Sequence, residues 1–226
     1  MSSVDFYYAP GACSLVSHIA LEETGVEFVP HALALVVGEH RTLEYVALNP
    51  SGKVPTLVVD GYPLTETLAI VHWLDDICPP AGLLPKSREP MKRAHDLSMI
   101  YWFASTVHPV FTRFRAAPAI IDDPAAYGKI AAHAAPVLAG YFQIAATRLG
   151  RQEWVLGDRS VADAYLFWLW TEAVAGGFDG ASFPALAAHT ERFAERSTTR
   201  AALAREATAV AAFVRRGVSM KFPEVR

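Results

Sequence analysis

The sequence predicts an α+β fold in which a domain with a mixed sheet precedes an all-helical domain. Short β-prone segments alternate with helical segments over the first 80 or so residues, as expected for strands and helices packed in layers. A polar, turn-like stretch follows at Pro85–Pro90, and almost everything beyond it is patterned as helix. We therefore expect two domains, residues 1–84 and residues 91–226.

The first domain is expected to alternate strands with helices before a final strand pair and helix. Gly25 is a suitable helix stop because glycine readily adopts a left-handed conformation. This βαβ unit followed by αββα is the order found in thioredoxin-like modules. The expected elements are strands at Val4–Tyr8, Glu27–His31, Thr56–Asp60 and Tyr62–Leu64, and helices at Ser14–Glu23, Thr42–Leu48 and from Thr65 or Glu66 to Ile77.

The second domain is expected to contain only helices. Pro109 and Pro136 lie inside two of them and predict kinks or local breaks, since proline lacks the N–H that a helix interior needs. The uncharged run between Lys129 and Arg148 falls just short of the roughly 20 residues of a membrane span, so we interpret it as an Ala-rich buried helix. The expected helices are Met91–Arg115, Pro124–Leu149, Val161–Ala175, Pro184–Arg196 and Thr199–Val214.

Composition narrows the functional classes. The formal net charge is −3 and the pI is near 6.2, so no basic footprint for nucleic acid is present. The two cysteines, Cys13 and Cys78, form neither a disulfide framework nor a zinc spacing, which favours a reduced cytoplasmic setting without a metal. The first eleven residues lack the pattern of a signal peptide.

The loop between Asn49 and Thr56 predicts a binding site. Asn-Pro and Ser-Gly are turn signals, and Pro55 is tolerated as the residue that opens a strand. A cis Val54–Pro55 bond is plausible here, because cis costs only about 0.5–1 kcal/mol before proline. It would turn the Val54 N–H and C=O outward, where they can pair with an extended peptide.

Four motifs in fixed order make the chain resemble the cytosolic glutathione S-transferase family, and most of all its bacterial beta class. The resemblance implies glutathione as co-substrate, conjugation to a hydrophobic electrophile in detoxification, and a cytoplasmic homodimer that binds neither nucleic acid nor membrane. The motifs are Phe6–Ser14 with Ser17-His18-Ile19, Asn49–Pro55, Leu64–Thr67 with Ala69-Ile70 and Trp73-Leu74, and Gly157–Ala164.

Three residues are candidates for activating the thiol of glutathione. Cys13 precedes a helix, whose free N–H groups stabilise a thiolate, although it is equally a small residue suited to burial. In the beta class the matching cysteine contacts the glutathione sulfur and can form a mixed disulfide. In sister classes a Tyr or Ser hydroxyl donates to the thiolate, which makes Tyr8 and Ser14 alternatives. Tyr8 also fits a core position of the strand.

Other candidates would hold the rest of glutathione. Glu66 and Thr67 open a helix, where N–H groups bind anions, and they suit the ammonium and carboxylate of the γ-glutamyl end. A purely structural alternative makes Thr65 the N-cap of that helix. Val54 and Pro55 would hold the cysteinyl backbone. Lys53 would face the glycine carboxylate, although a lone lysine is more often solvated.

The sequence departs from the beta-class pattern in two places. Leu35–Gly38 is apolar where these proteins often carry a lysine for the glycine carboxylate, so His40 or Arg41 would have to substitute. The resemblance places His108 near the thiol, where it would bind glutathione, but Pro109 follows it instead of lysine. A packing role in the helix is the alternative for His108.

The segment Ser160–Asp163 matches a capping box before an apolar helix, and we interpret it as structural. Two further functions remain open from the sequence. A glutathione-dependent thiol transferase or lyase would use Cys13 to form a mixed disulfide. A non-catalytic module would bind glutathione or another ligand on the same fold without turnover.

Overall fold

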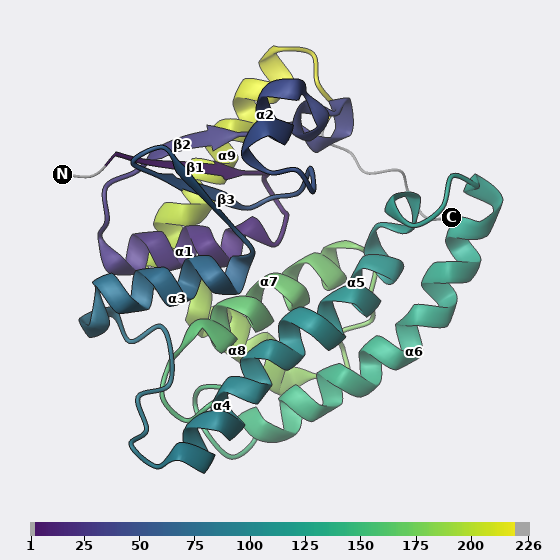
Figure 1. The fold of residues 1–226 in the computed structure, drawn as a ribbon. Coiled ribbons are helices and arrows are strands. Elements are labelled where there is room, and N and C mark those ends of the chain that lie inside the picture. The colour runs from purple at the N-terminus through teal and green to yellow at the C-terminus, as the bar shows by residue number, and fades with distance from the viewer. Residues whose placement is uncertain (1–2, 220–226) are drawn as a thin grey trace. The chain divides into compact units, whose positions relative to one another are not determined.

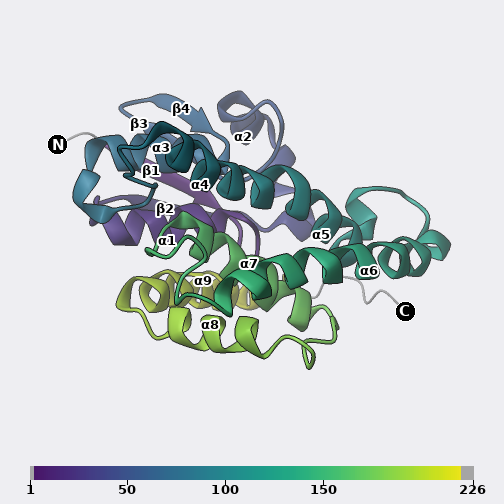
Figure 2. The same cartoon turned by 90° about the horizontal axis from the view of Figure 1, so that it is seen from below.

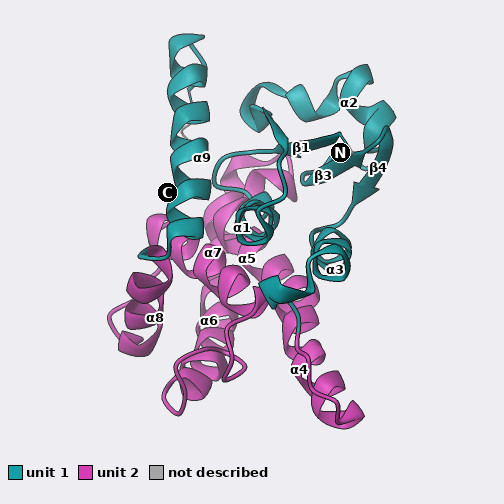
Figure 3. Cartoon of the chain, turned by 90° about the vertical axis from the view of Figure 1, so that its left-hand side faces the viewer, with its two compact units in different colours: residues 1–84, 195–220 teal, residues 85–194, 221–226 magenta. Residues whose placement is uncertain are grey.

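The computed structural model of the chain describes residues 3–219 (Figure 1). These residues divide into two compact units, one formed by residues 3–84 and 195–219 and the other by residues 85–194 (Figure 3). The division after residue 84 falls at the polar stretch identified in the sequence. Residues 220–226, part of the second predicted domain, lie outside the described residues.

The first unit is built on a four-stranded mixed sheet with the order β2-β1-β3-β4. β1 runs parallel to β2 and antiparallel to β3, and β3 pairs with β4 as a hairpin. Phe6 lies opposite both Pro30 and Leu57, and its ring is fully buried. This confirms the predicted thioredoxin-like sheet. The strands are β1 Val4–Tyr8, β2 Val29–Ala32, β3 Thr56–Val59 and β4 Tyr62–Thr65.

Helices cover both faces of this sheet. α1 (Ser14–Thr24) and α3 (Thr67–Ile77) lie on one face, and the short α2 (Leu43–Leu48) lies on the other (Figure 1). Gly25 ends α1 with φ +67°, so the predicted left-handed stop is confirmed. The Val54–Pro55 peptide bond is cis, also as predicted.

The last helix, α9 (Ser197–Arg215), groups with the first unit and packs along α1. Ion pairs join α1 to α9 and its N-cap: the N-cap residue Arg196 lies 3.1 Å from Glu23, and Arg205 lies 2.6 Å from Glu22. This segment was expected in the second domain. Helical periodicity shows that a segment has an apolar face, but it does not show which element covers that face.

The second unit is a helical bundle. The stretch predicted as one helix is α4 (Pro90–Trp102) and α5 (His108–Arg115), joined by a π-helical turn at Phe103–Val107. The turn ends two residues before Pro109, so the predicted local break is present and is made by a π-bulge. The remaining helices are α6 Pro124–Leu149, α7 Val161–Ala175 and α8 Pro184–Ala194.

α7 is the central helix of this unit and lies among α4, α5 and α8 (Figure 2). It is buried on nearly every side, as its continuous apolar run predicts. The capping box is confirmed: Ser160 accepts from backbone N–H groups of the first turn, and Asp163 accepts from the Ser160 N–H at 2.9 Å.

α6 corrects one expectation, because only one of its faces is buried. Buried side chains recur every three or four residues, while Val137 and Ile144 are 40% and 48% exposed. The helix continues through the exposed Pro136. By length and apolar composition alone α6 could cross a membrane, but core helices of soluble proteins pass the same test, so this is weak evidence.

Candidate functional site

Three motifs that are distant in the sequence meet in the first unit. Cys13 precedes α1, Val54 precedes β3, and Thr67 opens α3. The Cys13 thiol donates to the Val54 carbonyl at 3.5 Å and is hydrogen-bonded to the Thr67 side chain. The charges of Lys53 and Glu66 also act on this thiol. The structure therefore brings five of the predicted site residues together.

The surroundings of Cys13 favour its neutral thiol form. Burial raises its pKa to about 11, although the Thr67 hydrogen bond, its own backbone N–H and Lys53 act in the opposite direction. The expected lowering by a backbone N–H at the helix start is present, but the cost of burying the charge is larger, so the net direction is upward. A neutral thiol is a hydrogen-bond donor, so Cys13 can donate to an anionic sulfur.

The two alternative hydroxyls lie in different surroundings. Ser14 is fully buried, and its hydroxyl donates to the Ala9 carbonyl while accepting from the Ala9 N–H, both at 3.1 Å. Its single proton is thus used locally. Tyr8 is 3% exposed and packs against the His18 ring, with centroids 4.8 Å apart. Burial and the nearby Glu206 raise the Tyr8 pKa to about 12.

A buried polar group links the loop before Cys13 to α9. Glu206 accepts from the Gly11 N–H at 3.0 Å, and its other oxygen lies 3.9 Å from His18 Nδ1. His18 is fully buried in α1. Because Gly11 is two residues from Cys13, this contact helps fix the backbone that presents the thiol. No pattern in the sequence indicates this contact, because Glu206 lies in the far C-terminal helix.

The γ-glutamyl end of the predicted site has an unusual backbone. Glu66 caps α3 with φ +71°, a region that residues other than glycine seldom adopt, and its side chain is exposed. Such strain clusters at ligand sites. Thr65 ends β4 and does not cap the helix, so the structural alternative for this segment was wrong. Thr67 is 8% exposed at the start of α3.

The segment expected at the glycine end lies between β2 and α2. The apolar Leu35–Val37 and then Glu39–Arg41 form two 3₁₀ turns. The His40 carbonyl lies so close to Gly52 that a Cβ there would be 3.3 Å from it, and Gly52 has φ +59°. Burial and Arg41 lower the pKa of His40, so the exposed Arg41 is the better cation for a carboxylate.

His108 belongs to the second unit, where it begins α5. Its Nδ1 lies 3.2 Å from the Tyr165 hydroxyl, and its ring meets the edge of Trp168 with centroids 4.7 Å apart. These contacts suit the packing alternative and leave the binding role a prediction.

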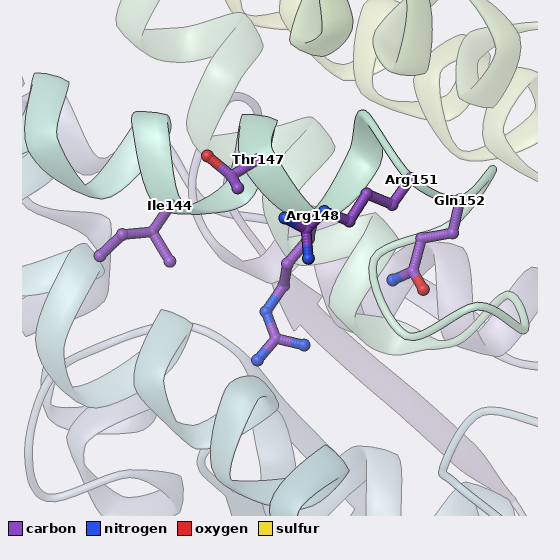
Figure 4. A pocket seen from close by; sticks show the side chains of 5 residues that line it. All are labelled: Ile144, Thr147, Arg148, Arg151 and Gln152. Carbon is purple, nitrogen blue, oxygen red and sulfur yellow. The ribbon is translucent and has the colours of Figure 1, made fainter.

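The second unit also has an open hollow of about 490 Å³ at the end of α6. Figure 4 shows Arg148 and Arg151 among its side chains, with Ile144, Thr147 and Gln152. No predicted site residue lines it, and we assign it no role in the chemistry. Within residues 3–219, no group of three or more His, Cys, Asp or Glu side chains is placed to hold a metal.

Comparison with known proteins identifies the class that this fold and cluster define. The family model for the glutathione S-transferase N-terminal domain matches residues 2–76, and the model for the C-terminal domain matches residues 105–197. The chain therefore belongs to the glutathione S-transferase family.

Individual relatives agree with this assignment. The chain is 35% identical over 209 residues to glutathione S-transferase GstA of Escherichia coli O157:H7, covering 88% of this chain and 97% of the relative. A sphingomonad glutathione S-transferase complexed with glutathione has a TM-score of 0.76 at 33% identity, covering 90% and 98% of the two chains. A beta-class enzyme of Sphingomonas chungbukensis has a TM-score of 0.76 at 32% identity, covering 89% and 98%.

Proposed function

We propose that the protein binds glutathione in its first unit and transfers the glutathione thiolate to a hydrophobic electrophile. The observation that carries this proposal is the convergence of Cys13, Val54 and Thr67 on one cluster. The glutathione-bound sphingomonad relative supports it. The helical unit, residues 85–194, would supply the electrophile pocket.

Each part of the tripeptide has a proposed partner. Glu66 takes the α-ammonium of the γ-glutamyl end, while the Thr67 hydroxyl and the first N–H groups of α3 take its carboxylate. The backbone of Val54, ahead of Pro55, pairs with the cysteinyl unit as an added strand does. Lys53 takes the glycine carboxylate, with Arg41 as the second cation.

The proposed chemistry is activation of a thiolate and its positioning. The neutral Cys13 thiol donates a hydrogen bond to the glutathione sulfur, which favours its anionic form and lowers its pKa. The thiolate attacks the electrophile, and the leaving group or the adduct takes the electron pair. Tyr8 is the second candidate donor, and Ser14 has a local structural role. His108 takes no step in this proposal.

Glutathione titration of wild-type protein and two Thr67 variants tests the proposal. Thr67→Val removes a hydroxyl that bonds the carboxylate and is expected to weaken glutathione binding roughly tenfold, whereas Thr67→Ser retains it. Isothermal calorimetry with each protein measures the change. Wild-type protein that gives neither heat nor a thermal shift with millimolar glutathione would disprove the proposed function.

We further propose that the protein is a cytoplasmic homodimer that acts in detoxification, as its family resemblance implies. The chain has a mass of 24.6 kDa. Sedimentation velocity is therefore expected to give a species of roughly twice that mass. A protein that stays monomeric at micromolar concentration would contradict the proposed dimer but not the proposed binding of glutathione.

A further inference from the structure

Three buried polar side chains form a hydrogen-bond ring behind the loop that carries Val54. Tyr45 lies in α2, Asn49 follows α2, and Thr56 opens β3; they are 3%, 3% and 0% exposed. Asn49 Nδ2 lies 2.7 Å from the Lys53 carbonyl oxygen and 3.1 Å from Thr56 Oγ1. The Tyr45 hydroxyl lies 2.9 Å from Thr56 Oγ1 and also bonds the Lys53 carbonyl.

The direction of every bond in the ring follows from the available donors. A carbonyl oxygen only accepts, so the Tyr45 hydroxyl must donate its one proton to Lys53. The Thr56 hydroxyl must then donate to Tyr45, and it accepts from Asn49. The Asn49 amide donates one proton to the Lys53 carbonyl and the other to the Thr56 hydroxyl. Its oxygen accepts from the Ser51 N–H and hydroxyl.

The ring fixes the orientation of the peptide between Lys53 and Val54. Its carbonyl oxygen receives two hydrogen bonds, from Tyr45 and Asn49, and so points into the ring. In a planar trans peptide the N–H points opposite to the C=O. The Val54 N–H therefore points away from the ring. Next along the chain, the Val54 carbonyl accepts from the Cys13 thiol.

We infer that Tyr45, Asn49 and Thr56 are positioning residues that aim the Val54 N–H at the cysteinyl carbonyl of glutathione. This inference rests on the proposed function. The ring holds the N–H in place before the ligand arrives, so binding does not have to order the loop, and such preorganisation increases affinity. None of the three side chains is required to touch glutathione.

Variants that open the ring with little change of shape test this role. Tyr45→Phe removes the donor to Lys53, and Thr56→Val replaces a hydroxyl with a methyl group. Thr56→Ser restores the hydroxyl and is the rescue variant. Tyr62→Phe is the matched control, because Tyr62 lies in the same unit and is 79% exposed.

Steady-state kinetics with 1-chloro-2,4-dinitrobenzene as the electrophile measure the KM for glutathione and the KM for the electrophile separately, and only the first is expected to change. Tyr45→Phe and Thr56→Val raise the KM and Kd for glutathione roughly tenfold, the effect of losing about one hydrogen bond. The kcat at saturating glutathione and the KM for the electrophile stay within about twofold of wild type. Thr56→Ser and Tyr62→Phe behave as wild type.

Other outcomes would overturn the inference. If both ring-opening variants bind glutathione as wild type does, the ring does not position Val54, while the proposed function stands. If kcat and both KM values change together, or if Thr56→Ser fails to rescue, the ring only maintains the fold. If wild-type protein does not bind glutathione, both proposals fail. Should Thr56→Val not fold, Tyr45→Phe alone decides, since it removes a single donor.

Discussion

Replacing Asp163 with alanine is expected to lower the free energy of unfolding by about 3–5 kcal/mol, because three buried hydrogen-bond donors lose their acceptor. Asp163 is fully buried at the start of α7. One carboxylate oxygen accepts from the Val155 N–H at 2.9 Å and from His189 Nε2 at 3.0 Å, and the other accepts from the Ser160 N–H. Alanine would leave all three donors without this acceptor in the centre of the helical unit.

Urea unfolding of three proteins measures this loss. Asp122→Ala is the matched control: its side chain is exposed, and its loss should change stability by no more than about 0.5 kcal/mol. Asp163→Asn keeps the size of the side chain and one acceptor oxygen. Its loss of unfolding free energy should therefore lie between those of Asp163→Ala and Asp122→Ala. A loss below about 1 kcal/mol for Asp163→Ala would show that the helix cap contributes little and that neighbouring groups or water replace the carboxylate.

The fold was largely predictable because local patterns decide most of it. Residues with a high β propensity indicate β1, and Gly25 marks the end of α1 by a conformation that glycine adopts readily. The π-helical turn before Pro109 was visible only as a proline inside a helix. The grouping of α9 with the first unit could not be predicted, because it depends on tertiary contacts between distant segments.

The candidate site was predictable in its residues and not in its electrostatics. The motifs around Cys13, Val54 and Thr67 could be located, and the structure brings them together. The pKa of Cys13 could not be derived, since it is a balance between burial and neighbouring charges that only the packed structure defines. The ring could not be predicted for a related reason. In the sequence Tyr45 is an ordinary helix residue and Asn49 is a turn residue, and only the structure shows that both side chains bond the Lys53 carbonyl.

The neutral state of Cys13 also bears on which chemistry the site performs. A mixed-disulfide enzyme needs its cysteine as a thiolate, because the thiolate is the nucleophile. With a pKa of about 11, the thiolate is a very small fraction of Cys13 at neutral pH. A hydrogen-bond donor needs the opposite state, the thiol. The structure thus favours a transferase in which glutathione supplies the nucleophile, over a thiol transferase that uses Cys13.

Alkylation of Cys13 by iodoacetamide is expected to be slow at pH 7 and to accelerate roughly a hundredfold by pH 9. Only the thiolate reacts, and its fraction rises about tenfold per pH unit below a pKa near 11. The Cys78→Ser variant leaves Cys13 as the sole cysteine of the chain, and mass spectrometry follows the adduct. The same variant unfolded in urea is the control, because its thiol has a pKa of about 8.5 and reacts faster at pH 7.

The same shift makes stability depend on pH in the alkaline range. The folded-state pKa of Cys13 lies above the unfolded value. The stability that the protonated thiol contributes to the folded state is therefore fully present below about pH 8.5 and is lost as pH rises toward 11. Cys13→Ala should remove this part of the decline while retaining conjugation, since Tyr8 and the backbone contacts remain. If folded Cys13 reacts at pH 7 as fast as the unfolded thiol, or if Cys13→Ala abolishes turnover, the cysteine acts as a nucleophile and the mixed-disulfide enzyme is the better hypothesis.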